Sequence, residues 1–292
     1  MKTFFSEDEA VITYTAKAIV CSNGYIKCKK YKKALKKVKD GFESSQNEVK
    51  NKKSNKDKEH EILKHNLLRS RNTLIEYASE NADIWKSFVT LTFDDLVDDI
   101  NEANKKFHIY VTQIKRKYPD FKYLGVPEFQ KRGAVHYHFL SSLRCGVEYP
   151  EREIKKTYNK EKDRYFELKY YDLPFWDHGY STAFNLSCTD QNFNVALYMC
   201  KYLFKDIDNR LFGRKKILKS NDLKKPVTIY LSDNEVYQDA MTYIKEKGYQ
   251  VNEFDFRPTD PFQIPFTQIT TNVSHSDCNI VKNKLMVNSY TE

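Results

Sequence analysis

The sequence lacks three features, each of which would have indicated a class of protein. Its six cysteines include no Cys-x-x-Cys pair, so they predict neither a zinc knuckle nor a disulfide framework. No hydrophobic run is long enough to span a bilayer, and acidic residues stand where a signal peptide would have its apolar core. No Gly-x4-Gly-Lys-Ser/Thr loop occurs, which excludes a helicase motor of the P-loop kind. We therefore expect a cytoplasmic protein with reduced cysteines and no membrane partner.

Positive charge is what the chain has in excess. Its 49 lysines and arginines outnumber its 40 acidic residues, and the formal net charge is +9. This balance favours a polyanionic partner such as nucleic acid. Lysines dominate residues 27–58, whose latter half has almost no apolar residue, so we expect a linker or a solvent-exposed helix there.

Alternation and helical spacing predict a mixed α+β fold. The predicted elements are a hairpin over 11–30, a helix near 62–77, a strand at 87–93, a helix capped by Asp94 or Asp95 that ends before Tyr118, strands at 122–129 and 134–143, a strand near 180–188, a helix at 191–206, a strand at 226–232, a helix near 234–247, a further strand and a polar tail. We divide the chain into an N-terminal hairpin, linker and helix (1–85), a central domain (86–216) with a surface insertion (149–178), and a C-terminal extension (217–292).

Two histidines stand one residue apart within the apolar stretch Lys122–Leu143. In a strand, His136 and His138 project to the same face, and Glu128 approaches them if the preceding segment is the neighbouring antiparallel strand. Two imidazoles and one carboxylate suit a divalent ion, Mg²⁺ or Mn²⁺, that acts on a phosphate substrate. Alternatively, one histidine is satisfied in the core and the other is exposed. Pro127 indicates an edge strand or a bulge beside this site.

Paired tyrosines mark the predicted helix at 191–206. Tyr198 and Tyr202 are four residues apart and share one face, and each is followed three residues later by a lysine, Lys201 or Lys205. A phenol attacks phosphorus only with help from a nearby cation, because its pKa is about 10. The alternative is that the two rings pack against a sheet, with the lysines simply solvated.

Three segments, FVTLTF, PEFQKRGAVHYHFL and YMCKYLFK, together resemble in order and spacing the three motifs of HUH endonucleases. Over about residues 86–216 the likeness is specifically to rolling-circle replication initiators of the two-tyrosine type. It implies an HUH/RRM-like palm, in which an antiparallel sheet with a central His-x-His strand is flanked by helices. Tyr137 stands where the family name implies a bulky apolar residue. Since that position faces away from the site, the departure should not matter.

The resemblance also implies residue roles. His136, His138 and Glu128 would bind the metal, and Tyr198, Tyr202 or both would attack DNA. The reaction would nick one strand at an origin through a 5′-phosphotyrosine, with Lys201 and Lys205 near the phosphate. The implied partners are single-stranded and origin double-stranded DNA, a host helicase and a DNA polymerase.

A basic segment follows the tyrosines, and a smaller basic group lies on the turn after Phe129. We expect both to contact DNA phosphates. These residues are Arg210, Arg214, Lys215 and Lys216 in the segment, and Lys131 and Arg132 on the turn.

Two other interpretations remain beside this one. A mobilisation relaxase or a transposase shares the metal pair and the tyrosine, although relaxases carry their tyrosine ahead of the histidines. A nonenzymatic DNA-binding regulator would use the basic surface and keep the histidines for structure.

Overall fold

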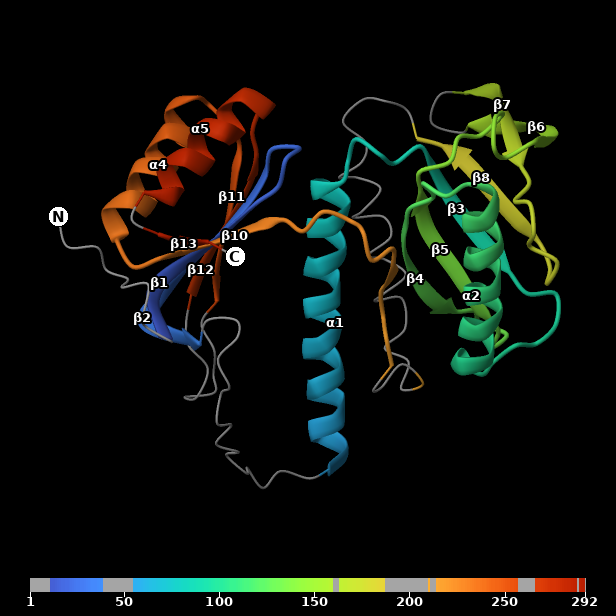
Figure 1. Ribbon diagram of the computed structural model, residues 1–292, viewed down its shortest axis with the longest axis horizontal. Coiled ribbons are helices and arrows are strands. Elements are labelled where there is room, and N and C mark those ends of the chain that lie inside the picture. Colours follow the sequence, from blue (N-terminus) through green and yellow to red (C-terminus); the bar gives the residue numbers. More distant parts are fainter. Residues whose placement is uncertain are drawn as a thin grey trace. The chain divides into compact units, whose positions relative to one another are not determined.

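A computed structural model describes residues 11–38, 55–159, 163–186, 210, 214–256, 266–287 and 289–291. The chain forms two compact units: a terminal unit, made of residues 1–52 and 225–292, and a central unit, made of residues 53–224. Each unit contains helices and an antiparallel sheet, which confirms the α+β prediction (Figure 1). Within the described ranges, no helix has both the length and the apolar character needed to cross a membrane.

The central unit is built on a seven-stranded sheet whose described pairings are antiparallel. Its strands follow the order β6-β7-β8-β3-β5-β4-β9. Their bounds are Ser87–Thr92 (β3), Tyr123–Phe129 (β4), Val135–Ser141 (β5), Glu151–Asn159 (β6), Arg164–Tyr171 (β7), Ser181–Asn185 (β8) and Leu218–Lys219 (β9). The histidine strand β5 therefore lies between β3 and β4, inside the sheet as predicted.

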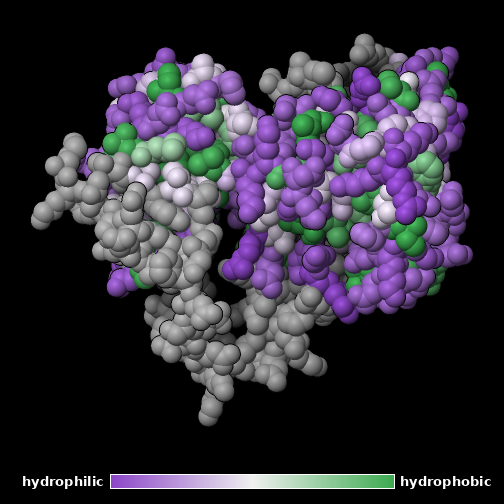
Figure 2. Space-filling model, viewed as in Figure 1, coloured by the Kyte–Doolittle hydropathy of each residue, from purple (hydrophilic) through white to green (hydrophobic). Residues whose placement is uncertain are grey.

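Helix α2, Ile100–Lys117, packs its apolar stripe against one face of this sheet (Figure 1). The stripe recurs at helical spacing and contacts the β5 side chains of Val135, Tyr137 and Phe139 in one buried cluster. Burying such a stripe removes apolar surface from water, which is the main favourable contribution to folding. Apolar residues are thus collected inside, and the face seen in Figure 2 is mostly hydrophilic.

The start of α2 differs from the prediction. The helix is capped by Asp99, whose carboxylate accepts a hydrogen bond from the Asn101 backbone N–H, and not by Asp94 or Asp95. The reason is that the chain first pairs with the histidine strand, where the Val135 N–H donates to the Val97 carbonyl. Leu96, predicted to belong to the buried stripe, accordingly lies before the helix and is 60% exposed.

Helix α1, Asn55–Glu80, contains the predicted 62–77 helix and contacts β4. Its C-terminal end is fixed by two hydrogen bonds between the Asn81 amide and the Lys224 backbone, at 2.9 and 3.0 Å. The Trp85 indole also donates to the Ala78 carbonyl at 3.0 Å. The end of α1 is therefore attached to the segment that follows β9.

The expected surface insertion at 149–178 is partly core. Strands β6 and β7 form a hairpin that continues the sheet beyond β8. The Tyr149 hydroxyl is hydrogen-bonded to Ser141 Oγ at 2.8 Å, and Tyr149 and Trp176 both belong to the central core cluster. Composition suggested a surface segment because charged residues surround these few buried aromatic side chains.

The terminal unit is a six-stranded antiparallel sheet with two helices on one face (Figure 1). Its strands follow the order β11-β12-β2-β1-β10-β13. Their bounds are Val11–Val20 (β1), Tyr25–Val38 (β2), Val227–Leu231 (β10), Val251–Phe256 (β11), Phe266–Asn272 (β12) and Tyr290–Thr291 (β13). The turn between β1 and β2 has Gly24 at φ +92°, as the predicted Asn-Gly hairpin requires.

Helices α4, Asn234–Glu246, and α5, His275–Met286, cover that sheet. The first was predicted; the second was expected to be polar tail. The chain ends that we expected as separate extensions share one sheet, because β1 pairs with β10 and β2 with β12. The lysine-rich linker at 39–54 and the predicted helix at 191–206 lie outside the described residues.

Candidate functional site

The hairpin of β4 and β5 brings together the three predicted metal ligands. Glu128 lies directly opposite His136 in the ladder, and the two strands pair without a register shift. His138 follows two residues along β5 on the same face. The bulge considered for Pro127 is therefore absent, while its edge position is confirmed for the described pairings, since β9 pairs only with Leu124 and Gly125.

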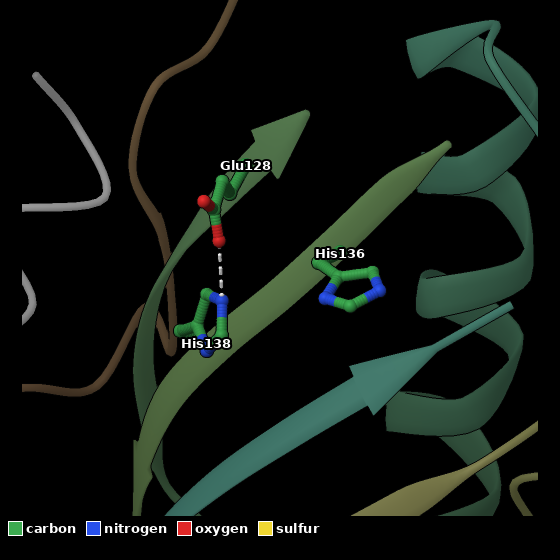
Figure 3. A group of neighbouring side chains, drawn as sticks. All are labelled: Glu128, His136 and His138. Carbon is green, nitrogen blue, oxygen red and sulfur yellow. Dashed lines mark hydrogen bonds and ion pairs between the residues drawn. The ribbon is translucent and has the colours of Figure 1, made fainter. Parts of the chain in front are cut away.

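These three side chains form a compact cluster (Figure 3). Glu128 Oε2 lies 2.8 Å from His138 Nε2, and the ligand atoms of all three residues lie within 4.8 Å of one another. All three are largely removed from solvent, with exposed fractions of 5% for Glu128, 9% for His136 and 6% for His138. A carboxylate in such a place is costly unless it is paired with a cation or a hydrogen-bond donor.

His138 is oriented from β3. Thr90 stands opposite it in the ladder, and Thr90 Oγ1 lies 3.1 Å from His138 Nδ1. The Phe88 ring is stacked on the same imidazole, with ring centroids 6.0 Å apart. When Nδ1–H donates to Thr90, Nε2 carries the lone pair and can coordinate a metal beside Glu128. The prediction missed Thr90 and Phe88, although the alternation of SFVTLTF placed both on one face.

The donor set fits a divalent ion. One carboxylate and two imidazoles supply three ligands and leave positions for water and substrate oxygens, as in other catalytic sites of this kind. The shared hydrogen bond between Glu128 and His138 shows that their ligand atoms already face one point (Figure 3). The arrangement can therefore concentrate positive charge where a phosphate would approach the open side of the hairpin.

Tyr137, between the two histidines, faces the opposite side of the sheet. Its hydroxyl donates to Asn104 Oδ1 at 2.9 Å, and its ring is stacked on Phe107 of α2. Burial raises the pKa of this phenol. The prediction that this position faces away from the site is confirmed, so Tyr137 has a packing role.

The predicted DNA contacts fall into different environments. The Arg132 guanidinium donates to the backbone carbonyls of Phe93 and Asp94, which fastens the β4–β5 turn to the end of β3. Arg210 donates to the Gly133 carbonyl at 3.2 Å, and its guanidinium lies 3.7 Å from the centre of the Phe129 ring. These two arginines surround the turn that leads into the histidine strand.

The remaining basic residues lie on the turn or follow Arg210 along the chain. Lys131 is exposed, and exposed Arg214 donates to Asn101 Oδ1 at 3.0 Å. Lys215 is exposed, whereas Lys216 is buried with its ammonium group 3.3 Å from the Arg214 carbonyl. Burial lowers the pKa of Lys216.

The predicted nucleophiles and their lysines cannot be placed. Tyr198, Lys201, Tyr202 and Lys205 all lie outside the described residues. The structure thus brings together the predicted metal ligands and part of the basic segment, and the tyrosine half of the site stays a prediction.

Comparison with known proteins points to DNA replication. Residues 86–207, which hold the Glu128, His136 and His138 cluster, match the model of a family of replication-associated proteins typified by ORF2. The chain is also 28% identical over 127 residues to the Phasyl DNA replicon protein arp of Escherichia coli, a stretch that covers 42% of this chain and 44% of that protein. The chain therefore spans less than half the length of this relative. No solved structure matches the chain. These similarities support a replication initiator.

Proposed function

We propose that this protein initiates rolling-circle replication by nicking and rejoining one DNA strand at an origin. The observation that carries the proposal is the buried cluster of Glu128, His136 and His138, within a region similar to replication-associated proteins. A structural role alone would not require three potential ligand atoms within 4.8 Å of one another on one face. In this proposal the central unit is an HUH-type palm.

The proposed chemistry is a transesterification. The phenolic oxygen of Tyr198 or Tyr202 attacks the scissile phosphorus, the phosphorus–O3′ bond breaks, and the departing 3′ oxygen takes up a proton. The products are a 5′-phosphotyrosine and a free 3′-hydroxyl, which a host polymerase extends. The second tyrosine repeats the attack at the regenerated junction and releases a closed circle. Because each step exchanges one phosphodiester for another, no nucleotide cofactor is needed.

The cluster has a defined part in this reaction. Glu128, His136 and His138 would hold Mg²⁺ or Mn²⁺, which when bound neutralises charge on the phosphate and favours the phenolate. Thr90 keeps the His138 imidazole in the required orientation from the neighbouring strand. Lys201 and Lys205, three residues after each tyrosine, are proposed to stabilise the phosphate charge.

A test of the proposal uses purified protein, Mg²⁺ or Mn²⁺, and labelled single-stranded oligonucleotides that tile the DNA flanking the gene. We expect a covalent protein–DNA adduct that survives a denaturing gel. The adduct should disappear in the Tyr198→Phe/Tyr202→Phe double variant and persist in Tyr118→Phe, a tyrosine at the end of α2. Failure to form an adduct with any oligonucleotide, or an adduct that persists in the double variant, would contradict the assignment.

The metal role is tested separately. His136→Ala should abolish nicking and leave salt-sensitive DNA binding intact, whereas His178→Ala, outside the cluster, should nick normally. Equal loss of nicking and binding in His136→Ala would favour the DNA-binding regulator, in which the histidines are structural. A relaxase or transposase of the same superfamily would form the adduct but would not support replication from a plasmid that carries the flanking DNA.

A further inference from the structure

A basic cleft runs along the outer edge of β4, away from the Glu128, His136 and His138 cluster. It lies between α1 and α2, is bounded by residues 215–221, and has a volume of about 940 Å³. Three segments that are distant in the sequence contribute to its walls. We refer to it as the β4-edge cleft.

The lining of the β4-edge cleft is strongly cationic. Among the described residues that line it there is no aspartate or glutamate, while six basic side chains do so. These are Arg69 from α1, Lys115 and Arg116 from α2, and Lys215, Lys216 and Lys219 from the third segment. Cations gathered in a concave, partly dry wall focus a positive potential that attracts anions. They also repel one another, so the unliganded arrangement is unfavourable by itself.

The third wall is fixed in place by hydrogen bonds. Leu218 and Lys219 pair with Gly125 and Leu124 of β4, and the Tyr123 N–H donates to Ser220 Oγ at 3.1 Å. The Lys219 ammonium lies 4.5 Å from the centre of the Tyr77 ring of α1. Because these contacts hold the basic segment in position, little ordering remains to be done when an anion binds.

Burial of Lys216 agrees with an anionic occupant. Its side chain is 7% exposed, and desolvation lowers its pKa. An ammonium group that has lost water regains favourable interactions when a phosphate enters.

The β4-edge cleft is connected to the metal-ligand cluster by a line of basic residues. Strand β4 has Glu128 near one end and Tyr123, which lines the cleft, at the other. The span from Leu124 to Phe129 is roughly 17 Å at ~3.4 Å per residue. Along this edge the chain passes from Arg210, at Gly133, through exposed Arg214 to the pairing of Lys219 with Leu124.

We propose that the β4-edge cleft binds the sugar–phosphate backbone of a single DNA strand whose scissile phosphate lies at Glu128, His136 and His138, an inference that rests on the proposed nicking function. A single strand fits because the cations converge on the cleft from three sides, which surrounds one backbone. A duplex would present its phosphates to only one of these walls. The contacts are to phosphates, so the cleft holds DNA without reading its sequence.

The test compares two triple variants with the same change in charge. Arg69→Ala/Lys115→Ala/Arg116→Ala removes cations from the cleft, and Arg71→Ala/Lys105→Ala/Lys117→Ala removes three exposed cations from the same two helices outside the cleft. Circular dichroism checks that both remain folded. The probe is a fluorescent oligothymidylate, whose affinity is measured by anisotropy over a range of salt concentrations without added metal.

The cleft variant should bind oligothymidylate at least tenfold more weakly at low salt. Its slope of log affinity against log salt should be shallower by about 2, from three lost contacts at ~0.7 each. The control variant should change neither quantity by as much. An unchanged affinity and slope in the cleft variant, equal losses in both variants, or a loss confined to duplex DNA would overturn the inference.

Nicking assays separate this inference from the proposed function. The cleft variant should still nick a short oligonucleotide that covers only the scissile site and should lose efficiency on a longer one. Absence of nicking in all variants and in the wild type would contradict the proposed function, while the binding experiment would still test the cleft.

Discussion

Glu128 lies opposite His136 in the β4–β5 ladder, yet its carboxylate is hydrogen-bonded to His138, two residues farther along the strand. Such diagonal contacts are within reach of long side chains on one face of an antiparallel pair. The diagonal places a carboxylate oxygen against His138 Nε2, while Thr90 occupies the region of Nδ1. His138 is thus fixed at both nitrogens, and the following predictions begin from this arrangement.

Thr90→Val should weaken metal binding without unfolding the protein. The change removes the hydroxyl that lies 3.1 Å from His138 Nδ1 and keeps the β-branched shape. Loss of such an orienting partner lowers metal affinity by about 10- to 100-fold. Titration with Mn²⁺ followed by electron paramagnetic resonance measures the affinity. Thr92→Val, on the same strand opposite His136, is the control, and an equal loss in both variants would contradict an orienting role for Thr90.

Arg132→Ala should destabilise the central unit. Its guanidinium donates to two backbone carbonyls at the end of β3, and charged hydrogen bonds of this kind contribute about 1–2 kcal/mol. Urea unfolding of the variant should therefore show a lower midpoint, whereas exposed Lys131→Ala should unfold as the wild type does. If Arg132→Ala lost DNA affinity with no change in unfolding, Arg132 would be a DNA contact and not a clamp on the turn.

Tyr137→Phe should lower stability and leave nicking unchanged. The substitution removes the hydroxyl that donates to Asn104 Oδ1 on the α2 side of the sheet and keeps the ring that stacks on Phe107. A lost hydrogen bond of this type costs about 1 kcal/mol. Thermal unfolding and the adduct assay measure the two effects. A large loss of adduct at full stability would show that Tyr137 acts at the site.

Gly125→Ala should be more disruptive than Gly146→Ala. A Cβ at Gly125 would lie 2.4 Å from the Phe139 Cβ and 2.8 Å from the His138 carbonyl, so β4 and β5 would have to separate. At Gly146, φ is +81° and the nearest atom would be 3.9 Å away, which leaves only the strain of a left-handed conformation, about 1–2 kcal/mol. Comparable unfolding midpoints for the two variants would contradict this close approach of the strands.

Asp277→Asn should destabilise the terminal unit at neutral pH but not in strong acid. Hydrogen bonds from Tyr243, Tyr249 and Ser274 lower the pKa of Asp277 from 3.8 to about 2. A carboxyl whose pKa is depressed by folding contributes stability above its unfolded pKa, and this contribution is lost as the pH falls from 3.8 through about 2.

The measurement is the unfolding free energy of wild type and variant as a function of pH. Their difference should be constant above about pH 4 and shrink toward about pH 2. Asp239→Asn, which breaks an exposed ion pair with Lys284, is the control and should have a small effect. A difference that does not vary with pH would show that the Asp277 carboxylate has no special role.

The central hairpin was predictable because its information is local. Alternation placed His136 and His138 on one face, and the short turn placed Glu128 on the adjacent strand, as observed. The helix start was not predictable to the same degree. Four aspartates precede α2, any of them has the chemistry of a cap, and only the tertiary bond between Val135 and Val97 selects Asp99.

The terminal unit was missed because its pairings join distant residues. Nothing in the local pattern of β1 indicates that Lys17 stands opposite Tyr230. The helical spacing of Cys278, Val281 and Leu285 was present in the sequence, but a polar composition concealed it. The β4-edge cleft was also hidden, since its cations come from three separate segments.

The terminal unit has a consequence for synthesis on the ribosome. The central unit is one continuous stretch of chain, so it can begin to fold once residue 224 has emerged. The first hairpin, β1 with β2, must wait for β10 and β12, which are made at least 189 residues after Val38. During that interval two strand edges are open to other chains, which is a hazard for aggregation. A chain that stops early would therefore keep Glu128, His136 and His138 while exposing the unpaired hairpin at its N-terminal end.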